Sequence, residues 1–374
     1  MPSAEGGWDS ALGTRHSALT KMIKALVIDD SAYNRVTISR MLESDSEINV
    51  VATANNGEDG IKQVVKHSPD VITLDLEMPV MDGFSFLRWL MQNRPTPVIA
   101  VSSKSSDRSV FKAMDLGAID FITKPGGNVS PRLEEIQRDL IAKVKQFASV
   151  QMANVRARIA EEAGQPPATV HKIGDIELIA IGCSTGGPPA LQHLFQSLPL
   201  MPIPIVVAQH MPPTFTRLFA ERVDRLTKYS VKEAVDGEPL VQGCVYVAPG
   251  GLQMEVHRSN GGLQVKITAP DATDLYAPSV DRLFGSASDA CGEKLVAVIM
   301  TGMGDDGARA IRRVRDRGGK TIAESSDTAI IFGMPNEAIK TGAVDQILPL
   351  SEIAPAIERL TRVKFDRDDR RVES

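Results

Sequence analysis

Short runs of β-branched residues alternate with amphipathic stretches of helical length along this chain, and the alternation occurs twice. The first series starts with KALVIDD at Lys24 and ends with DFITKP at Pro125. Five strands that alternate with helices predict a parallel sheet covered on both faces, because each parallel connection must cross over the sheet. We therefore expect a five-stranded parallel α/β domain.

The alternation restarts after EEAGQPPATVHKIGD (161–175), a polar stretch that contains glycine and two prolines. Such a composition predicts a linker. The second series runs from LIAIGCS at Leu178 to KTIAESS at Ser326 and predicts a larger, doubly wound and mostly parallel α/β domain. Within it, CVYVAPGGLQMEVHR (244–258) and LQVKIT (263–268) predict an antiparallel hairpin.

A chain of 374 residues is long enough for two domains of ordinary size. We place the first at 23–145 and the second at 173–365. One helix from about Pro131 to about Ala160 is expected to run into the linker, so 146–172 is assigned as helix end and linker.

Both ends of the chain are predicted to lie outside the domains. Residues 1–22 contain no apolar run long enough for a secretory signal, so we expect a disordered extension there. Residues 366–374, DRDDRRVES, form a charged tail that is not expected to pack.

Composition excludes several classes of protein. With 43% hydrophobic residues and a net charge of -5, the chain has neither a membrane protein's apolar segments nor a basic nucleic-acid-binding surface. Its three cysteines (Cys183, Cys244 and Cys291) are widely spaced and form no CxxC pair, which argues against a disulfide framework or a zinc site. We expect a cytoplasmic protein that neither inserts into a membrane nor binds nucleic acid.

Three carboxylates and a lysine fall at predicted strand ends in the first domain. Asp29 and Asp30 follow the first strand, Asp75 lies near the end of the third, and Lys124 follows the fifth. These side chains should converge, because the carboxyl ends of parallel strands share one edge. A single strand-end aspartate is often only a turn former, but three crowded carboxylates call for a hard cation such as Mg²⁺. An aspartate beside Mg²⁺ can accept a phosphoryl group, with Lys124 offsetting charge.

In the second domain, GCSTG (182–186) follows the apolar run LIAI and fits the pattern G-x-S-x-G. Such a turn exposes the hydroxyl of Ser184 at the sheet edge, although the same glycines could cradle a phosphate and Cys183 could be the nucleophile. A serine needs a base. Of the six histidines, His210 is the one that ends a neighbouring parallel strand, PIVVAQH (204–210), where a structural role is also common.

A third member would orient the imidazole and stabilise its charged form. KLVAVIMTG runs into MGDDG (303–307), which puts Asp305 and Asp306 at another strand end. Both residues fit this chemistry, and either could instead cap the following helix.

The same loop, GMGDDG (302–307), also matches the dinucleotide pattern G-x-G-x-x-G, with Glu324 suitably placed for a ribose. Two carboxylates inside the turn would repel a pyrophosphate at a cost on the order of a few kcal/mol. A nucleotide-sensing module built on this loop is therefore the alternative function.

Four motifs of the first domain (VIDDSAYNR, VITLDLEMPVMDGFSFL, VSS and DFITKP) resemble the receiver domain of two-component response regulators. The resemblance implies a flavodoxin-like fold in which Asp75 is the phosphoacceptor. It further implies the acidic pair Asp29 and Asp30, the Mg²⁺ ligands Asp30, Asp75 and the backbone carbonyl of Glu77, and the phosphate contacts Ser102 and Lys124.

Three motifs of the second domain (IGCSTGGPPAL, VVAQHMPPTFT and MTGMGDDGARA) resemble the catalytic domain of CheB-type protein-glutamate methylesterases, the chemotaxis response regulators. The resemblance implies Ser184 as nucleophile, His210 as general base and Asp306 as carboxylate. This order differs from that of the α/β-hydrolases. Cys183 stands where the family often has alanine, so we interpret it as a packing residue. Asp305 replaces a small residue and could tune its neighbours.

The resemblance implies hydrolysis of glutamate methyl esters on chemoreceptors, and deamidation of specific glutamines, without a cofactor for the ester chemistry. Backbone amides near Thr185 and Met303 would stabilise the oxyanion. A histidine kinase would phosphorylate Asp75 and so relieve a block that the receiver imposes, and we expect a monomer. The remaining alternative, a transcriptional regulator, would carry a smaller, basic helix-turn-helix domain.

Overall fold

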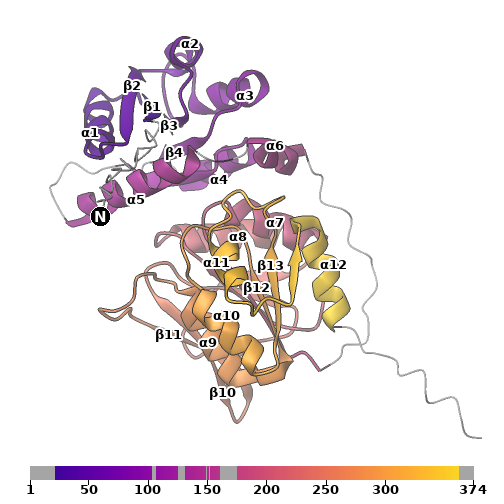
Figure 1. Ribbon diagram of the computed structural model, residues 1–374. Coiled ribbons are helices and arrows are strands. Elements are labelled where there is room, and N and C mark those ends of the chain that lie inside the picture. The colour runs from indigo at the N-terminus through magenta and orange to yellow at the C-terminus, as the bar shows by residue number, and fades with distance from the viewer. Residues whose placement is uncertain are drawn as a thin grey trace, which may run out of the picture.

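The structure is a computed structural model that describes residues 22–102, 107–124, 131–148, 150, 152–160 and 175–361. The predicted N-terminal extension up to residue 21, residues 161–172 of the predicted linker and the charged tail lie outside the described residues. Two parallel sheets and one separate hairpin make up the strands of the described part (Figure 1).

The N-terminal sheet has the order β2-β1-β3-β4-β5, and every neighbouring pair is parallel. This confirms the predicted five-stranded parallel sheet. The strands are β1 (Ile23–Ile28), β2 (Ile48–Ala54), β3 (Val71–Asp75), β4 (Val98–Ser102) and β5 (Asp120–Thr123). The helices are α1 (Ala32–Glu43), α2 (Gly57–His67), α3 (Gly83–Asn93), α4 (Asp107–Asp115) and α5 (Pro131–Phe147).

Helices α1, α2 and α3 each begin at a side-chain cap. The side chains of Ser31, Asn56 and Asp82 accept a hydrogen bond from a backbone N–H of the first helical turn. Such caps satisfy N–H groups that have no partner within the helix. The turns that follow β1, β2 and β3 therefore each end in a side-chain cap.

The C-terminal sheet is larger and has the order β14-β13-β12-β6-β7-β9-β8, again with parallel neighbours. Its strands are β6 (Leu178–Cys183), β7 (Ile205–Gln209), β8 (Ser230–Glu233), β9 (Cys244–Val247), β12 (Leu295–Ile299), β13 (Lys320–Glu324) and β14 (Gln346–Leu348). Its helices are α7 (Gly187–Ser197), α8 (Phe215–Leu226), α9 (Val280–Cys291), the 3₁₀ turn Gly292–Lys294, α10 (Ala308–Asp316), α11 (Met334–Lys340) and α12 (Leu350–Thr361).

The antiparallel hairpin is confirmed, but its extent was predicted wrongly. It consists of β10 (Gln253–Ser259) and β11 (Gly262–Thr268), whereas β9 joins the main sheet between β7 and β8. Pro249, Gly250 and Gly251 separate β9 from β10. The run CVYV is largely buried and pairs with β7 and with β8, the strand before it. A short apolar run does not specify which strands it pairs with.

The single helix expected from about Pro131 to about Ala160 is also wrong. The structure has two helices, α5 and α6 (Met152–Ala160). The Val150 N–H bonds the carbonyl of Phe147, only three residues back, so the α-helical ladder closes there. The strand β14 and the helices α11 and α12 were not predicted.

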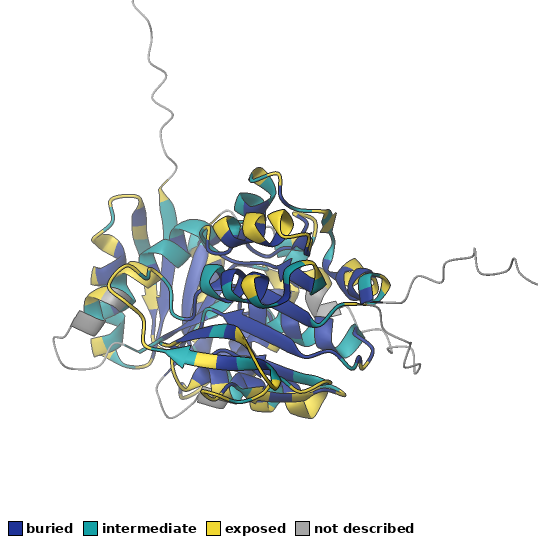
Figure 2. Cartoon of the chain, turned by 90° about the horizontal axis from the view of Figure 1, so that it is seen from below, coloured by how far each residue is buried: buried dark blue, intermediate teal, exposed yellow. Residues whose placement is uncertain are grey.

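The strand order brings the carboxyl ends of β7, β6 and β12 side by side at the centre of the larger sheet. After β6 the chain continues to β7 on one side of it and returns later to β12 on the other side. This reversal of strand order is the topological switch point, where ligands bind in open parallel sheets. The central strands of both sheets are buried, whereas the edge strands β2, β8 and β14 are partly exposed. The covering helices expose their outer faces (Figure 2).

Helix α4 packs against α7 and α8 and so joins the two sheet domains. Phe111 and Phe219 have ring centroids 6.0 Å apart, and Phe121 and Phe215 have centroids 4.4 Å apart. Figure 1 shows α4 and α5 between the N-terminal sheet and the C-terminal domain. The contact is therefore made by the β4–β5 side of the N-terminal domain.

Helix α9 lies directly on β6, and Gly182 makes this close contact possible. A Cβ atom at Gly182 would lie 2.2 Å from Cγ1 of Val280, far inside van der Waals contact. The glycine therefore determines how near the start of α9 comes to the end of β6.

We predict that Gly182→Ala lowers the free energy of unfolding by about 1–3 kcal/mol, because strand or helix must shift to admit the methyl group. Thermal unfolding monitored by circular dichroism measures the change. Gly261→Ala is the control, since a Cβ atom there meets nothing within 4 Å. Equal melting temperatures for the two variants would contradict the prediction.

Candidate functional site

Ser184 lies immediately after β6, in the turn that leads into α7. Its backbone N–H donates to the carbonyl of Thr301 at 3.0 Å, and its carbonyl accepts from the N–H of Gly187 at 2.8 Å. Gly186 completes the turn with φ of +74°, a conformation that favours glycine. The serine is half-buried, and its turn is held on both sides.

His210 follows β7, the neighbour of β6. Its backbone N–H donates to the carbonyl of Cys183 at 3.1 Å, which ties the two strand ends together. Its Nε2 lies 2.8 Å from Oδ2 of Asp306. A neutral imidazole that donates Nε2–H to a carboxylate has its lone pair on Nδ1. Nδ1 is therefore the nitrogen that can accept a proton.

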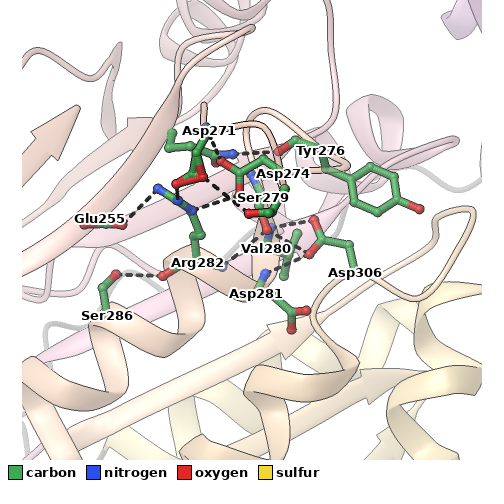
Figure 3. A network of polar contacts seen from close by, with 12 residues as sticks. Glu255, Asp271, Asp274, Tyr276, Ser279, Val280, Asp281, Arg282, Ser286 and Asp306 are labelled. Atoms are coloured by element: carbon green, nitrogen blue, oxygen red, sulfur yellow. Dashed lines mark hydrogen bonds and ion pairs between the residues drawn. The ribbon is translucent and has the colours of Figure 1, made fainter. Parts of the chain in front are cut away.

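Asp306 follows β12 and is buried at the start of α9. Its carboxylate accepts hydrogen bonds from the hydroxyl of Ser279 at 3.0 Å and from the backbone N–H groups of Val280 at 2.7 Å and Asp281 at 2.9 Å (Figure 3). Burial raises the pKa of Asp306, but hydrogen bonding and charge interaction with His210, and the two N–H donors, outweigh it and lower the pKa below its ordinary value. The carboxylate stays ionised.

The structure gives the two aspartates of the MGDDG loop different environments. Asp305 is exposed, and its carbonyl accepts from the N–H of Ala308 at 3.0 Å. Asp306 contacts His210. Of the pair, Asp306 is thus the residue that can orient the imidazole.

The two residues predicted to supply oxyanion amides flank the serine. Thr185 follows it directly, and its carbonyl accepts from the hydroxyl of Thr301 at 2.9 Å. Met303 follows Gly302, where a Cβ atom would lie 2.9 Å from Cβ of Ser184. The two loops are therefore in contact at the serine, and the oxyanion role of these amides stays a prediction.

Cys183 is fully buried, and its thiol donates to Oε1 of Gln209 at 3.1 Å. Burial, with a smaller contribution from the charge of Glu324, raises the pKa of this thiol well above its ordinary value. A protonated, inaccessible thiol is not a nucleophile. The interpretation of Cys183 as a packing residue is confirmed.

Sequence reasoning missed Gln209, the buried last residue of β7, which pairs with Cys183 of β6. Its Nε2 donates to the carbonyls of Ser184 at 2.9 Å and of His210 at 3.0 Å. A Cβ atom at Gly187 would lie 2.0 Å from its Oε1, so the turn leaves room for this side chain. The position of Gln209 next to His210 was the available signal.

The dinucleotide alternative is not supported by the environment of Glu324. This residue is fully buried, and its carboxylate accepts from the backbone N–H of Thr301 at 2.8 Å and from the hydroxyl of Thr328 at 3.0 Å. Gly302 pairs through its N–H with the carbonyl of Ile331 at 3.0 Å. The glutamate thus holds the loop together instead of facing a ribose.

In the N-terminal domain, the predicted carboxylates converge. Asp29, Asp30 and Asp75 each offer an oxygen, and these oxygens lie within 4.8 Å of one another. Nζ of Lys124 lies 2.6 Å from Oδ2 of Asp75 and 3.6 Å from Oδ2 of Asp29. Ser102 is buried at the end of β4, and its carbonyl accepts from the N–H of Lys124 at 2.7 Å.

The acidic cluster fits a divalent cation. Burial raises the pKa of Asp75 to about 6; the hydrogen bond from Lys124 opposes this shift, and the charge of Asp29 adds to it. Crowded carboxylate oxygens of this kind suit a hard cation such as Mg²⁺. The Glu77 N–H donates to Oδ1 of Asp75 at 3.2 Å, and its carbonyl as a metal ligand stays a prediction.

Comparison with known proteins agrees with this geometry. Residues 179–357 match the family described as CheB methylesterase, and residues 25–131 match the response regulator receiver domain. "Protein-glutamate methylesterase/protein-glutamine glutaminase 1" of Myxococcus xanthus (strain DK1622) is 47% identical over 346 residues, which cover 91% of this chain and 98% of the relative. The chain belongs to the protein-glutamate methylesterase/protein-glutamine glutaminase family.

A second relative of this family, "Protein-glutamate methylesterase/protein-glutamine glutaminase 3" of Geobacter sulfurreducens (strain ATCC 51573 / DSM 12127 / PCA), is 42% identical over 359 residues, covering 90% of this chain and 97% of the relative. A crystal structure of the Thermotoga maritima CheB methylesterase catalytic domain is 39% identical, with a TM-score of 0.48, and covers 50% of this chain and 98% of that one. The two family matches and the two relatives show that the chain is a methylesterase-family hydrolase with a receiver domain. Across the described residues, no helix combines the length and the apolar character needed to cross a bilayer.

We predict that Mg²⁺ raises the melting temperature of the full chain at pH 7 by about 2–4 °C at tenfold its dissociation constant, because the ion binds the folded state. Without Mg²⁺, the contribution of Asp75 to the free energy of unfolding should fall as pH rises from about 4 to about 6. In that range the folded protein keeps the Asp75 proton, whose pKa is about 6, while the unfolded chain has released it.

Differential scanning fluorimetry in Mg²⁺ or EDTA measures both effects. Asp75→Asn should remove most of the Mg²⁺ response and the Asp75 contribution to the pH dependence, which is the difference between the two chains from about pH 4 to about pH 6. Asp316→Asn changes an exposed carboxylate of α10 and serves as the control. A full Mg²⁺ response in Asp75→Asn would contradict the assigned cluster.

Proposed function

We propose that this enzyme hydrolyses glutamate γ-methyl esters, and deamidates specific glutamines, on the cytoplasmic helices of chemoreceptors. The observation that carries the proposal is the contact between Nε2 of His210 and the buried carboxylate of Asp306, one strand away from the turn of Ser184. A nucleophile, a base and an orienting carboxylate on adjacent strand ends support acyl transfer.

In the proposed reaction, Nδ1 of His210 takes the proton of the Ser184 hydroxyl as its oxygen attacks the ester carbonyl. The tetrahedral intermediate collapses and expels methanol, which receives the proton from the imidazolium. Water then attacks the acyl-enzyme with the same base, and serine and the glutamate carboxylate are released. A glutamine side chain follows the same path with ammonia as the leaving group.

Asp306 would serve this cycle as a fixed anion. Its hydrogen bonds from Ser279, Val280 and Asp281 hold the carboxylate ionised and in one orientation. The carboxylate then keeps the proton on Nε2 and stabilises the imidazolium during each transfer. Backbone amides of Thr185 and Met303 are proposed to stabilise the oxyanion.

We further propose that phosphorylation of Asp75 by a histidine kinase activates the enzyme. The carboxylates of Asp30 and Asp75 and the backbone carbonyl of Glu77 would hold Mg²⁺, which would neutralise the charge of the two carboxylates. Lys124 already contacts the Asp75 carboxylate, and Ser102 lies at the end of the adjacent strand. These two residues would contact the phosphoryl group.

Direct contacts between the domains support a regulatory role for the receiver. The hydroxyl of Thr185, next to the nucleophile, donates to Oδ2 of Asp120 at 2.9 Å. The same carboxylate oxygen lies 3.1 Å from Nζ of Lys143. Arg222 pairs with Asp115 at 2.6 Å. A receiver that rests on the residue after Ser184 can restrict access until phosphorylation changes the interface.

The partners that follow from this proposal are a chemoreceptor as substrate and a histidine kinase as phosphodonor. The enzyme would act in the cytoplasm as a monomer, without nucleic acid.

We predict that Ser184→Ala lowers methanol release by more than about 1,000-fold, because the acyl-enzyme cannot form. Release from methyl-labelled receptor membranes in the presence of a small phosphodonor measures this rate. Cys183→Ala should stay within about threefold of the unsubstituted chain, since alanine fits the buried position. Methanol release at the normal rate from Ser184→Ala would refute the nucleophile.

The phosphodonor response tests the assignment of the phosphosite. Asp75→Asn should abolish stimulation by acetyl phosphate and Mg²⁺, because an amide cannot form the acyl phosphate. The measurement is the ratio of methanol release with and without phosphodonor. Asp59→Asn, on the capped first turn of α2, controls for loss of an aspartate elsewhere on the same domain. Stimulation that persists in Asp75→Asn would place the phosphosite elsewhere.

A further inference from the structure

Tyr276 stacks on the imidazole of His210. The two ring centroids lie 4.6 Å apart, and the ring planes differ by 5°. Asp306 meets the edge of the imidazole at Nε2, so the tyrosine and the aspartate contact two different parts of the same ring. No motif of the sequence pointed to Tyr276, which lies 66 positions after His210 in the chain.

We propose that Tyr276 is a positioning residue for His210. We also propose that the ion pairs of the loop 271–276 with Arg282 keep the tyrosine ring stacked on the imidazole. The proposal rests on the proposed role of His210 as the base. A parallel aromatic ring on one face restricts rotation of the imidazole, and a π-face next to the ring stabilises the cation that forms during proton transfer.

The loop before α9 is held by Arg282, on the first turn of that helix. Nε of Arg282 lies 3.0 Å from Oδ1 of Asp274, and its guanidinium also pairs with Asp271 and, at 3.4 Å, with Oε1 of Glu255. Figure 3 shows this network beside Tyr276 and Asp306. The loop between Asp271 and Tyr276 is therefore pinned to α9 by a set of ion pairs around one arginine.

A buried glutamine holds the backbone of the same loop. Nε2 of Gln253 donates to the carbonyl of Tyr276 at 2.7 Å, and its Oε1 accepts from the N–H of Ser279 at 2.8 Å. Gln253 is fully buried, and its bond with Ser279 is shielded from water. Tyr276 is thus held at its main chain as well as through the ion pairs of its loop.

The structure also makes room for the tyrosine ring. A Cβ atom at Gly304 would lie 2.5 Å from the Tyr276 hydroxyl, so the MGDDG loop passes close to the ring edge. Gly304 has φ of +85°, which glycine adopts without strain. The face of the ring, and not its hydroxyl, lies against His210. Phenylalanine at position 276 should therefore keep the stacking contact.

The same first turn of α9 therefore organises both contacts of the imidazole. Val280 and Asp281 donate to the carboxylate at its edge, and Arg282 holds the loop that covers its face. Stabilisation of a ring cation by an aromatic face corresponds to about a fivefold to thirtyfold effect on rate. The effect should fall on kcat, because the substrate is not the group that Tyr276 contacts.

The test uses the full chain with phosphodonor and two readouts. The first is kcat and KM for methanol release. The second is labelling of Ser184 by phenylmethanesulfonyl fluoride, followed by intact mass. In that step the serine oxygen bonds to sulfur, fluoride leaves, and His210 takes the hydroxyl proton, so the readout needs no receptor. Melting temperatures identify variants that fail to fold.

Tyr276→Leu should lower kcat and the labelling rate by about tenfold while KM changes by less than about twofold. Tyr276→Phe should stay within about threefold of the unsubstituted chain. Normal labelling and normal kcat in a folded Tyr276→Leu would overturn the proposal, as would a Tyr276→Phe that is as slow as Tyr276→Leu.

A double-mutant cycle tests the role of the loop. Arg282→Met should lower kcat in the unsubstituted chain but add nothing in Tyr276→Leu, if the arginine acts through the tyrosine. Arg313→Met is the matched control, because it removes an ion pair with Asp289 away from this loop. Additive losses for Arg282→Met and Tyr276→Leu would overturn the link between them.

The labelling of His210→Ala tests the proposed base separately from the role of Tyr276. Labelling of His210→Ala at the normal rate would overturn the base and, with it, the role of Tyr276. Loss of labelling in His210→Ala together with normal labelling in Tyr276→Leu would overturn the stacking role alone.

Discussion

The carboxylate of Asp306 binds the N-terminal turn of α9, and the rest of the active site is arranged around this interaction. A buried carboxylate requires hydrogen-bond donors, and Ser279, Val280 and Asp281 supply three of them. The positive end of the helix dipole favours the same negative charge. Once Asp306 is fixed, Nε2 of His210 has one partner at 2.8 Å, and its tautomer follows.

Close packing brings the three strand ends within reach of one another. Neighbouring parallel strands are separated by about 4.8 Å, and β6 lies between β7 and β12, so the residues that follow these three strands share one edge of the sheet. Gly182 lets α9 lie on β6, and Gly302 lets the MGDDG loop lie against Ser184. The glycines around the serine therefore allow neighbouring segments of backbone to pack closely together. The sequence had also allowed them to form a phosphate-binding loop.

The short strand β5 connects the two functional sites. Asp120 at its start accepts from Thr185, next to the nucleophile, and Lys124 directly after its end contacts Asp75. Four residues of strand span about 13 Å at 3.3 Å per residue. Under the proposed regulation, a phosphoryl group on Asp75 would change the contacts of Lys124. Strand β5, which Lys124 follows, begins with Asp120, the residue that contacts Thr185.

The sequence by itself determined both parallel sheets and the strand-end positions of Asp75, Ser184 and His210, because local hydrophobic patterns encode strands and parallel strands end at one edge. Residue chemistry alone left both Asp305 and Asp306 open, and only the family resemblance favoured Asp306, because adjacent turn residues differ in direction and the N–H donors to Asp306 come from α9. Nor could the sequence place β9, because a short apolar run does not specify its neighbours, and β9 lies between β7 and β8 in the sheet. Tyr276 reaches His210 only through the tertiary packing of the Arg282 loop, a contact that no local pattern records.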